Sequence, residues 1–233
     1  MRRTINKYIS DFTELFFPRI CMVCGNALIN QEKLVCLHCL HEIPRTNFHF
    51  EERNPVAEMF YGRVQVESAT SFFFFRKGSN YQKLIHALKY KGIKEIGILL
   101  GNHFAADLQK SPLFAGIDIV CPVPLHPKKE KKRGYNQSEF IARGIAGRMN
   151  KTLSVNNLVR IVYTDSQTRK GRYERWENVE GIFKLTDPDG FEGKHILLVD
   201  DVVTTGSTLE ACAATILQAT QNTKVSIATL GFA

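Results

Sequence analysis

One stretch of thirteen residues limits most strongly what this chain can fold into. Residues 196–208 read Ile-Leu-Leu-Val-Asp-Asp-Val-Val-Thr-Thr-Gly-Ser-Thr. The leading apolar residues predict a strand that is buried on both faces, as is typical of parallel sheets. Two carboxylates follow, and then a hydroxyl-rich turn around Gly206 and a helical pattern. Because open α/β sheets bind ligands beyond the carboxyl ends of their strands, this order predicts a binding site there.

The parts of this stretch suit the groups of a phosphorylated ribose. Asp200 and Asp201 offer paired acceptors for the two hydroxyls of a sugar diol. Gly206 lets the backbone turn tightly and approach a ligand. A helix from about Ser207 to Thr220 would direct free N–H groups and its positive end at an anion. The alternative is an ordinary helix cap with solvated aspartates, which explains one acid but not two acids with a glycine-centred hydroxyl loop.

The rest of the chain indicates an α/β fold. Strand and helix patterns alternate from about residue 116 to the end, which favours βαβ units and a parallel sheet. The predicted elements there are Ile117–Val123, Ser138–Met149, Leu158–Val162, Ile196–Val199, Thr208–Ala219 and Lys224–Thr229. Earlier in the chain, Val64–Phe75 reads as a strand, and Asn80–Tyr90 and Glu95–Leu108 read as helices.

Length and composition set the class of protein. A chain of 233 residues with 44% hydrophobic residues can bury one α/β core and carry a small module beside it. An uninterrupted apolar run of the length that spans a membrane is absent from the sequence. Near the N-terminus, Ile5, Ile9 and Phe12 follow helical spacing, and Asp11 and Glu14 interrupt any signal-like run. We therefore expect a cytoplasmic protein with an amphipathic N-terminal helix.

Four cysteines form two CxxC pairs separated by eleven residues. The pairs are Cys21 with Cys24 and Cys36 with Cys39. Two such pairs complete a tetrahedral thiolate shell, which predicts a structural zinc site. Disulfides are the main alternative, disfavoured in a reducing cytoplasm, and a redox CxxC would need only one pair. His38 and His41 are possible substitute ligands.

Much of the net charge of +8 lies in two clusters. One is Lys128, Lys129, Lys131, Lys132 and Arg133, and the other is Arg169, Lys170, Arg172 and Arg175. Positive clusters favour polyanions such as pyrophosphate or nucleic acid, although a solvated surface loop would look the same. We expect a basic loop after the strand that ends near Val123, where its cations would neutralise a departing pyrophosphate.

Residues 196–208 resemble the phosphoribosyl pyrophosphate (PRPP) signature of type I phosphoribosyltransferases. Pro-Val-Pro-Leu-His (122–126), Arg-Gly-Tyr-Asn-Gln-Ser (133–138) and the CxxC pairs occur with it in one order, and the whole resembles the ComF competence family. The resemblance implies a type I phosphoribosyltransferase-like parallel sheet flanked by helices, with a zinc-ribbon-like module. The implied boundaries are 1–45 for the helix and zinc module and 46–233 for the phosphoribosyltransferase-like domain, with 46–115 as a hood and 116–233 as its core.

The resemblance also implies roles for individual residues. Asp200, Asp201 and Arg133 would be catalytic, with Mg²⁺ bound alongside PRPP. The 5-phosphate would be held by Val202, Val203, Thr204, Thr205, Gly206, Ser207 and Thr208. Pyrophosphate or another polyanion would be held by His126, Lys128, Lys132, Arg133, Arg172 and Arg175.

Two functional hypotheses follow. The first is a phosphoribosyltransferase that uses PRPP and Mg²⁺ on an acceptor the sequence does not reveal, in a protein of DNA uptake and natural transformation. The second is a non-catalytic adaptor for single-stranded DNA, indicated by aromatic residues among the basic segments such as Tyr135 and Trp176. The family also implies a helicase-like competence partner. A PRPP sensor without turnover is a third, weaker reading.

Overall fold

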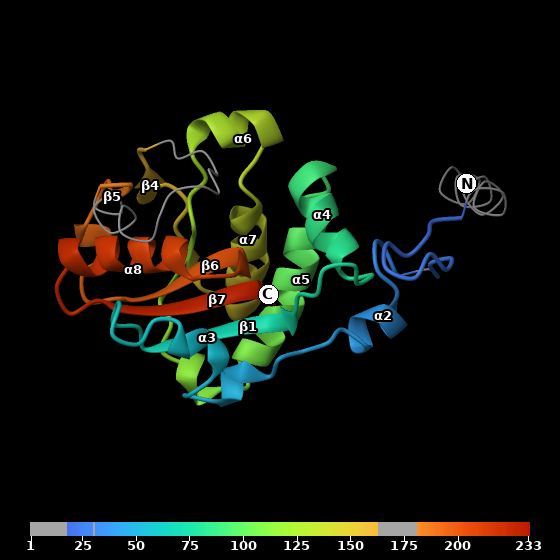
Figure 1. Cartoon of the computed structure of the whole chain (residues 1–233), viewed down its shortest axis with the longest axis horizontal. Helices are drawn as coiled ribbons and strands as arrows, with labels where there is room; N and C mark the ends of the chain where they lie inside the picture. Colours follow the sequence, from blue (N-terminus) through green and yellow to red (C-terminus); the bar gives the residue numbers. More distant parts are fainter. Residues whose placement is uncertain (1–17, 30, 163–180) are drawn as a thin grey trace, which may run out of the picture.

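A five-stranded parallel sheet forms the centre of the computed structural model, which describes residues 18–29, 31–162 and 181–233. The spatial order is β1-β7-β6-β2-β3, and all four ladders are parallel. The strands are β1 (Ser68–Phe74), β2 (Ile119–Pro122), β3 (Thr152–Leu153), β6 (His195–Val203) and β7 (Lys224–Phe232). The predicted α/β class is confirmed (Figure 1).

Helices cover both faces of this sheet. On one face, Leu197 and Val199 join a core with α4 (Gln82–Tyr90), α5 (Glu95–Leu108) and α7 (Gln137–Met149). On the other face, Ile196 and Leu198 pack with α8 (Ser207–Ala219). This division follows from the alternation of side chains along β6, in which every residue from Ile196 to Val199 is buried.

The contact between α5 and α7 brings two backbones together through glycine. A Cβ at Gly101 would collide with the carbonyl oxygen of Ile141, and one at Gly144 would lie within 3 Å of Ile98 and Asn102 backbone atoms. Since α7 begins after the segment that links it to β2, this packing fixes where that segment ends.

The strand order locates the ligand-binding edge of the sheet. From β2 the chain passes to β3 on one side, whereas β6, β7 and β1 lie on the other. The order therefore reverses between β2 and β6, and crevices of doubly wound sheets form at that point.

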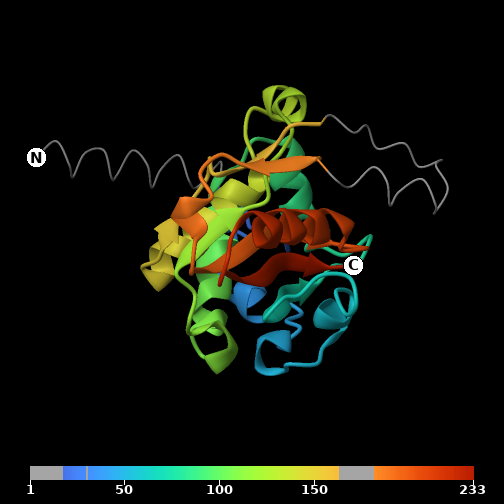
Figure 2. The same cartoon turned by 90° about the vertical axis from the view of Figure 1, so that its left-hand side faces the viewer.

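Two local predictions were wrong. Leu158–Val162 was expected among the alternating sheet strands, but β4 (Leu158–Arg160) pairs antiparallel with β5 (Phe183–Leu185) in a separate ribbon that packs on α8 (Figure 2). The basic segment after β2 was expected to be a loop, but Pro127–Arg133 forms the helix α6. His126 caps it by accepting the N–H of Lys128, and Pro127 occupies a first-turn position that suits proline.

The cysteine segment packs against the core that lies on the α4, α5 and α7 face of the sheet. The cysteine segment carries α2 (Leu37–His41) and lies at one end of the molecule, next to α4 (Figure 1). It is followed by η1 (Phe48–Phe50) and α3 (Pro55–Glu58); the other short turns are η2 (Pro112–Phe114) and η3 (Asp189–Phe191). Residues 46–115 supply β1 and α5 to the central layers, and the proposed boundaries stay a prediction. Within the described ranges, no helix is long and apolar enough to cross a membrane.

Candidate functional site

Two adjacent carboxylates at the end of β6 face different surroundings. Asp200 and Asp201 lie within the strand, which extends to Val203, so their side chains point to opposite faces of the sheet. Each carboxylate has its own set of partners.

Asp200 is held by the segment that follows β2, the neighbouring strand. Its Oδ1 accepts hydrogen bonds from Ser138 Oγ at 2.7 Å and from the N–H of Asp201 at 2.8 Å. Ser138 is placed by the first turn of α7, where Asn136 caps the helix and donates from Nδ2 to the Val123 carbonyl at 3.0 Å. Burial, followed by the negative charge of Asp201, raises the pKa of Asp200 to about 7.

Asp201 is paired with a lysine from α4. Lys89 Nζ lies 2.9 Å from Asp201 Oδ1, and the two side chains are only 23% and 11% exposed. The ammonium thus neutralises one of the two carboxylates in a setting largely removed from water. Asp201 remains an acceptor with its second oxygen and lone pairs.

The turn after β6 is supported by the segment that follows α3. Gly206 has φ +74°, and a Cβ there would lie 3.1 Å from Phe60 Cε1. Arg63 donates to the Thr205 carbonyl at 3.1 Å and pairs with Glu210 of α8. Glycine is required at this position because the conformation is left-handed and Phe60 leaves little room.

Hydroxyl groups and free helix N–H groups meet in this turn. Thr205 Oγ1 and Ser207 Oγ lie 3.1 Å apart, and α8 begins at Ser207 with no side-chain cap on its first N–H groups. Thr204, Thr205, Ser207 and Thr208 are all exposed. An anion placed here would find donors and the positive end of a thirteen-residue helix.

The basic side of the site is α6. The helix has one acid, Glu130, among its cations, and none of its residues is buried; it projects beyond the sheet (Figure 1). Arg133 at its end donates to Gln137 Oε1 at 2.7 Å, and its guanidinium lies 5.6 Å from the centre of the Tyr90 ring. Lys128 and Lys132 are exposed.

The four cysteines form a cluster that can hold a metal ion such as zinc. Their Sγ atoms all lie within 4.8 Å of one another. The N–H groups of Cys36 and Cys39 donate to the sulfurs of Cys21 and Cys36 at 3.3 and 3.4 Å. Burial opposes ionisation of Cys21, but N–H donors from Cys24, Cys36 and Val23 outweigh it and lower its pKa to about 6. Burial raises the pKa of Cys36 and of Cys39, so a metal ion would displace the protons of these two thiols on binding.

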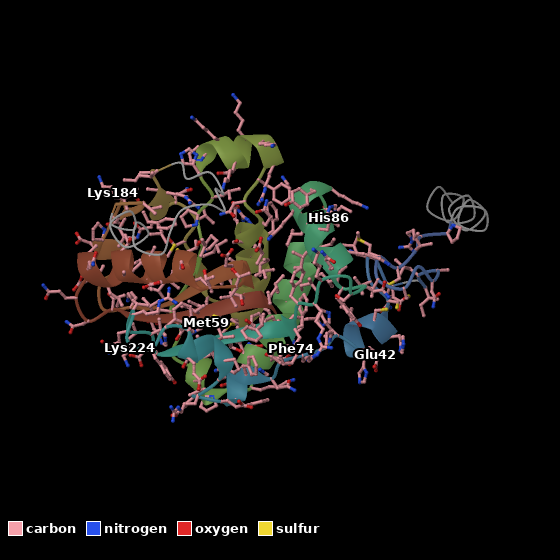
Figure 3. All side chains as sticks on the ribbon, in the orientation of Figure 1. Glu42, Met59, Phe74, His86, Lys184 and Lys224 are labelled. Atoms are coloured by element: carbon pink, nitrogen blue, oxygen red, sulfur yellow. The ribbon has the colours of Figure 1, made fainter. Side chains whose placement is uncertain are left out.

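A basic pocket lies on the exposed face of α4 and the residues that flank this helix. Its volume is about 270 Å³, and it is lined by Gly78, Ser79, Gln82, Lys83, His86 and Lys91. His86 projects from α4 to the surface (Figure 3), and its ring lies 4.9 Å from that of Tyr90, which is 65% exposed. Arg133, the last residue of α6, lies over the Tyr90 ring and so connects this face to α6.

Comparison with known proteins identifies the type of domain to which β6, α8 and the turn between them belong. The model of the phosphoribosyl transferase domain matches residues 135–231. Competence protein ComFC of Bacillus subtilis is 33% identical over 112 residues, which is 48% of this chain and 43% of that protein. DNA utilization protein YhgH of Salmonella typhi is 29% identical over 138 residues, 58% of this chain and 60% of that protein.

The chain carries a ComF-type phosphoribosyltransferase-like domain. The ComF resemblance predicted from the sequence is thereby confirmed. The chain spans less than two thirds of the length of each of these two relatives. A solved hypoxanthine phosphoribosyltransferase from Staphylococcus aureus aligns with a TM-score of 0.38 and 19% identity, covering 59% of this chain and 63% of that one.

The ComF-type domain brings several predicted residues together. Asp200 and Asp201 stand at the sheet edge with the turn from Thr204 to Thr208. Val202 and Val203 belong to β6 itself, so only their backbone could serve a phosphate. Arg172 and Arg175 lie outside the described residues, so their predicted role stays untested.

Sequence reasoning missed four residues that contact or face this site. They are Phe60, Arg63, Lys89 and Arg160. Arg160 of β4 is half-buried, and burial lowers its pKa while the nearby charges of Cys212 and Asp200 raise it. Nothing in the local sequence distinguishes Lys89 from Lys83, the other lysine of α4, because only the tertiary packing brings Lys89 to Asp201.

Proposed function

We propose that this protein binds PRPP with Mg²⁺ at the turn after β6 and acts in DNA uptake during natural transformation. The observation that carries the proposal is the joint placement of an uncapped helix N-terminus, a hydroxyl turn and two carboxylates at the end of β6, next to the point where the strand order reverses. The relatives named for competence and DNA utilisation support the biological role.

The residues would divide the ligand between them. The turn from Thr204 to Thr208 would hold the 5-phosphate, and Asp200 and Asp201 would accept from the ribose hydroxyls. Arg133 and the lysines of α6 would face the pyrophosphate, where fixed positive charge stabilises the charge that develops as the glycosidic bond breaks. Mg²⁺ bound together with PRPP would withdraw charge from the leaving pyrophosphate.

Calorimetry with PRPP and Mg²⁺ tests this proposal. Wild-type protein should bind, and the double variant Asp200→Ala with Asp201→Ala should lose most of the affinity because the hydroxyl acceptors are gone. Glu52→Gln removes the charge of an exposed acid on the η1–α3 loop; it is the surface control and should bind as wild type does. Absence of binding by the wild-type protein would refute the proposal. A screen of bases, nucleotides and DNA ends for PRPP-dependent pyrophosphate release would then identify the acceptor.

A second candidate function is binding of single-stranded DNA. The face that supports it runs from the basic pocket over His86 and Tyr90 to Arg133 and α6. Exposed rings alternating with cations suit stacked bases and a phosphate backbone.

Oligonucleotide binding at several salt concentrations tests the second candidate. Affinity should fall steeply with salt, and Tyr90→Ala should weaken binding about tenfold, since stacking on one ring contributes roughly 1–3 kcal/mol. Tyr61→Ala removes another exposed tyrosine, which lies outside this face, and should have no effect. The double substitution of Asp200 and Asp201 should leave DNA affinity unchanged or raised. Equal losses from Tyr90→Ala and Tyr61→Ala would count against this face.

A further inference from the structure

Helix α4 contacts the cysteine cluster at one end and the carboxylate pair at the other. At its first turn, Tyr81 donates from its hydroxyl to the Cys39 carbonyl at 2.9 Å, and Lys83 Nζ donates to the Val23 carbonyl at 3.3 Å. Both carbonyls belong to the knuckles that carry the cysteines. In its last turn, Lys89 reaches Asp201 at 2.9 Å.

The helix can transmit position because its inner face is packed throughout. Leu84, Ile85, Ala87 and Leu88 are all buried, in the same core as three of the cysteines. The last turn also receives a hydrogen bond, because the Tyr135 hydroxyl donates to the Leu88 carbonyl. Tyr135 directly precedes Asn136, which caps α7 and thereby places Ser138 against Asp200.

The charge of Lys89 matters for a polyanionic ligand. Two carboxylates without a nearby cation would repel a sugar phosphate that carries several negative charges. Since Lys89 and Asp201 are both largely buried, their attraction is screened less than that of a surface pair. Lys89 therefore keeps Asp201 oriented as a hydroxyl acceptor while cancelling its charge.

We propose that Lys89 is a positioning residue of the phosphoribosyl site, and that a metal ion in the cysteine cluster fixes Lys89 through α4. The inference rests on the proposed binding of PRPP. A metal held by all four sulfurs would fix both knuckles, and with them the carbonyls of Val23 and Cys39. Loss of the metal would release the first turn of α4 and leave Lys89 less well placed at the other end.

Binding of PRPP with Mg²⁺ is measured by calorimetry in four states: wild type and Lys89→Met, each zinc-loaded and zinc-depleted. We expect Lys89→Met to weaken binding about tenfold, within the usual range for coupled sites. Zinc depletion should weaken binding by wild type by a similar factor and change Lys89→Met little further. Lys89→Arg keeps the charge and should retain most of the affinity. Lys77→Met, which removes an exposed lysine before α4, is the control and should bind as wild type does.

A second variant removes the coupling without disturbing the cysteines. Tyr81→Phe combined with Lys83→Met deletes both contacts to the knuckles, so zinc-loaded protein should bind PRPP more weakly. Hydrogen exchange should show faster exchange of the last-turn amides of α4 in this variant and after zinc depletion.

The outcomes separate this inference from the proposed function. If zinc-loaded wild type fails to bind PRPP, the proposed function itself is wrong. If wild type binds but zinc depletion weakens wild type and Lys89→Met by equal factors, the metal acts through another route and the coupling is refuted. Tighter binding by Lys89→Met would show that Lys89 blocks Asp201, and would also overturn the inference.

Discussion

Substituting Asp200 by asparagine should stabilise the protein at alkaline pH. The folded protein raises the pKa of this carboxyl from 3.8 to about 7, chiefly through burial. The folded state therefore holds the proton more tightly than the unfolded chain does. The stabilisation from this group is complete below the unfolded pKa and is lost as the pH rises through 7. Asparagine keeps the shape and the Oδ1 acceptor for Ser138 but does not ionise.

The magnitude follows from the two pKa values. Each pKa unit corresponds to about 1.36 kcal/mol, and integration of the two titrations between pH 5 and pH 8 gives a loss of about 2.5 kcal/mol for wild type. The difference in unfolding free energy between Asp200→Asn and wild type should therefore grow in favour of the variant by about that amount. Other titrating groups are common to both proteins and cancel in the difference.

Urea unfolding at pH 5, 6, 7 and 8, with zinc present throughout, measures this difference. Ser138→Ala is the second variant. It removes a donor that lowers the pKa of Asp200, so its loss of stability should extend to higher pH than that of wild type. Parallel pH profiles for wild type and Asp200→Asn would refute the reasoning, because they would mean that Asp200 ionises in the folded protein as it does in the unfolded chain.

Three further predictions concern packing and metal. Gly206→Ala should lower the unfolding free energy by about 1–2 kcal/mol because of the left-handed backbone alone, and should weaken PRPP binding. Phe60→Leu in the same chain should restore part of the lost stability. Urea unfolding and calorimetry measure the two effects. Gly101→Ala should destabilise the protein by roughly 1–3 kcal/mol, since its Cβ meets the Ile141 carbonyl; a Tm equal to that of wild type would contradict the close α5–α7 contact. Metal analysis should find one zinc per chain in wild type and well under one in Cys24→Ser.

The central sheet and its helices could be predicted because their patterns are local. Glu95–Leu108 is a helix with the bounds expected, and the strand expected at Ile196–Val199 extends as β6 to take in both carboxylates. Apolar periodicity identifies such elements and their buried faces. The cysteine cluster could also be predicted, because the spacing within two CxxC pairs already brings four thiols within reach of one metal ion.

The remaining features depend on contacts between segments far apart in the sequence. A strand pattern such as Leu158–Val162 does not specify its partner, and β4 pairs with β5 rather than joining the main sheet. The position of Lys89 depends on how α4 packs, which its own sequence does not reveal. The opposite orientation of Asp200 and Asp201 could have been inferred from strand alternation, had the strand been extended through them.

One peptide group lies between the two carboxylates of the site. The bond between Asp200 and Asp201 separates a side chain that lies near Cys212 of α8 from one that pairs with Lys89 of α4. Its N–H donates to the carboxylate of Asp200. The amide resonance of Asp201 should therefore shift in a nuclear magnetic resonance spectrum both when Asp200 titrates and when zinc is withdrawn some distance away. A single probe nucleus would thus register events on both faces of the sheet.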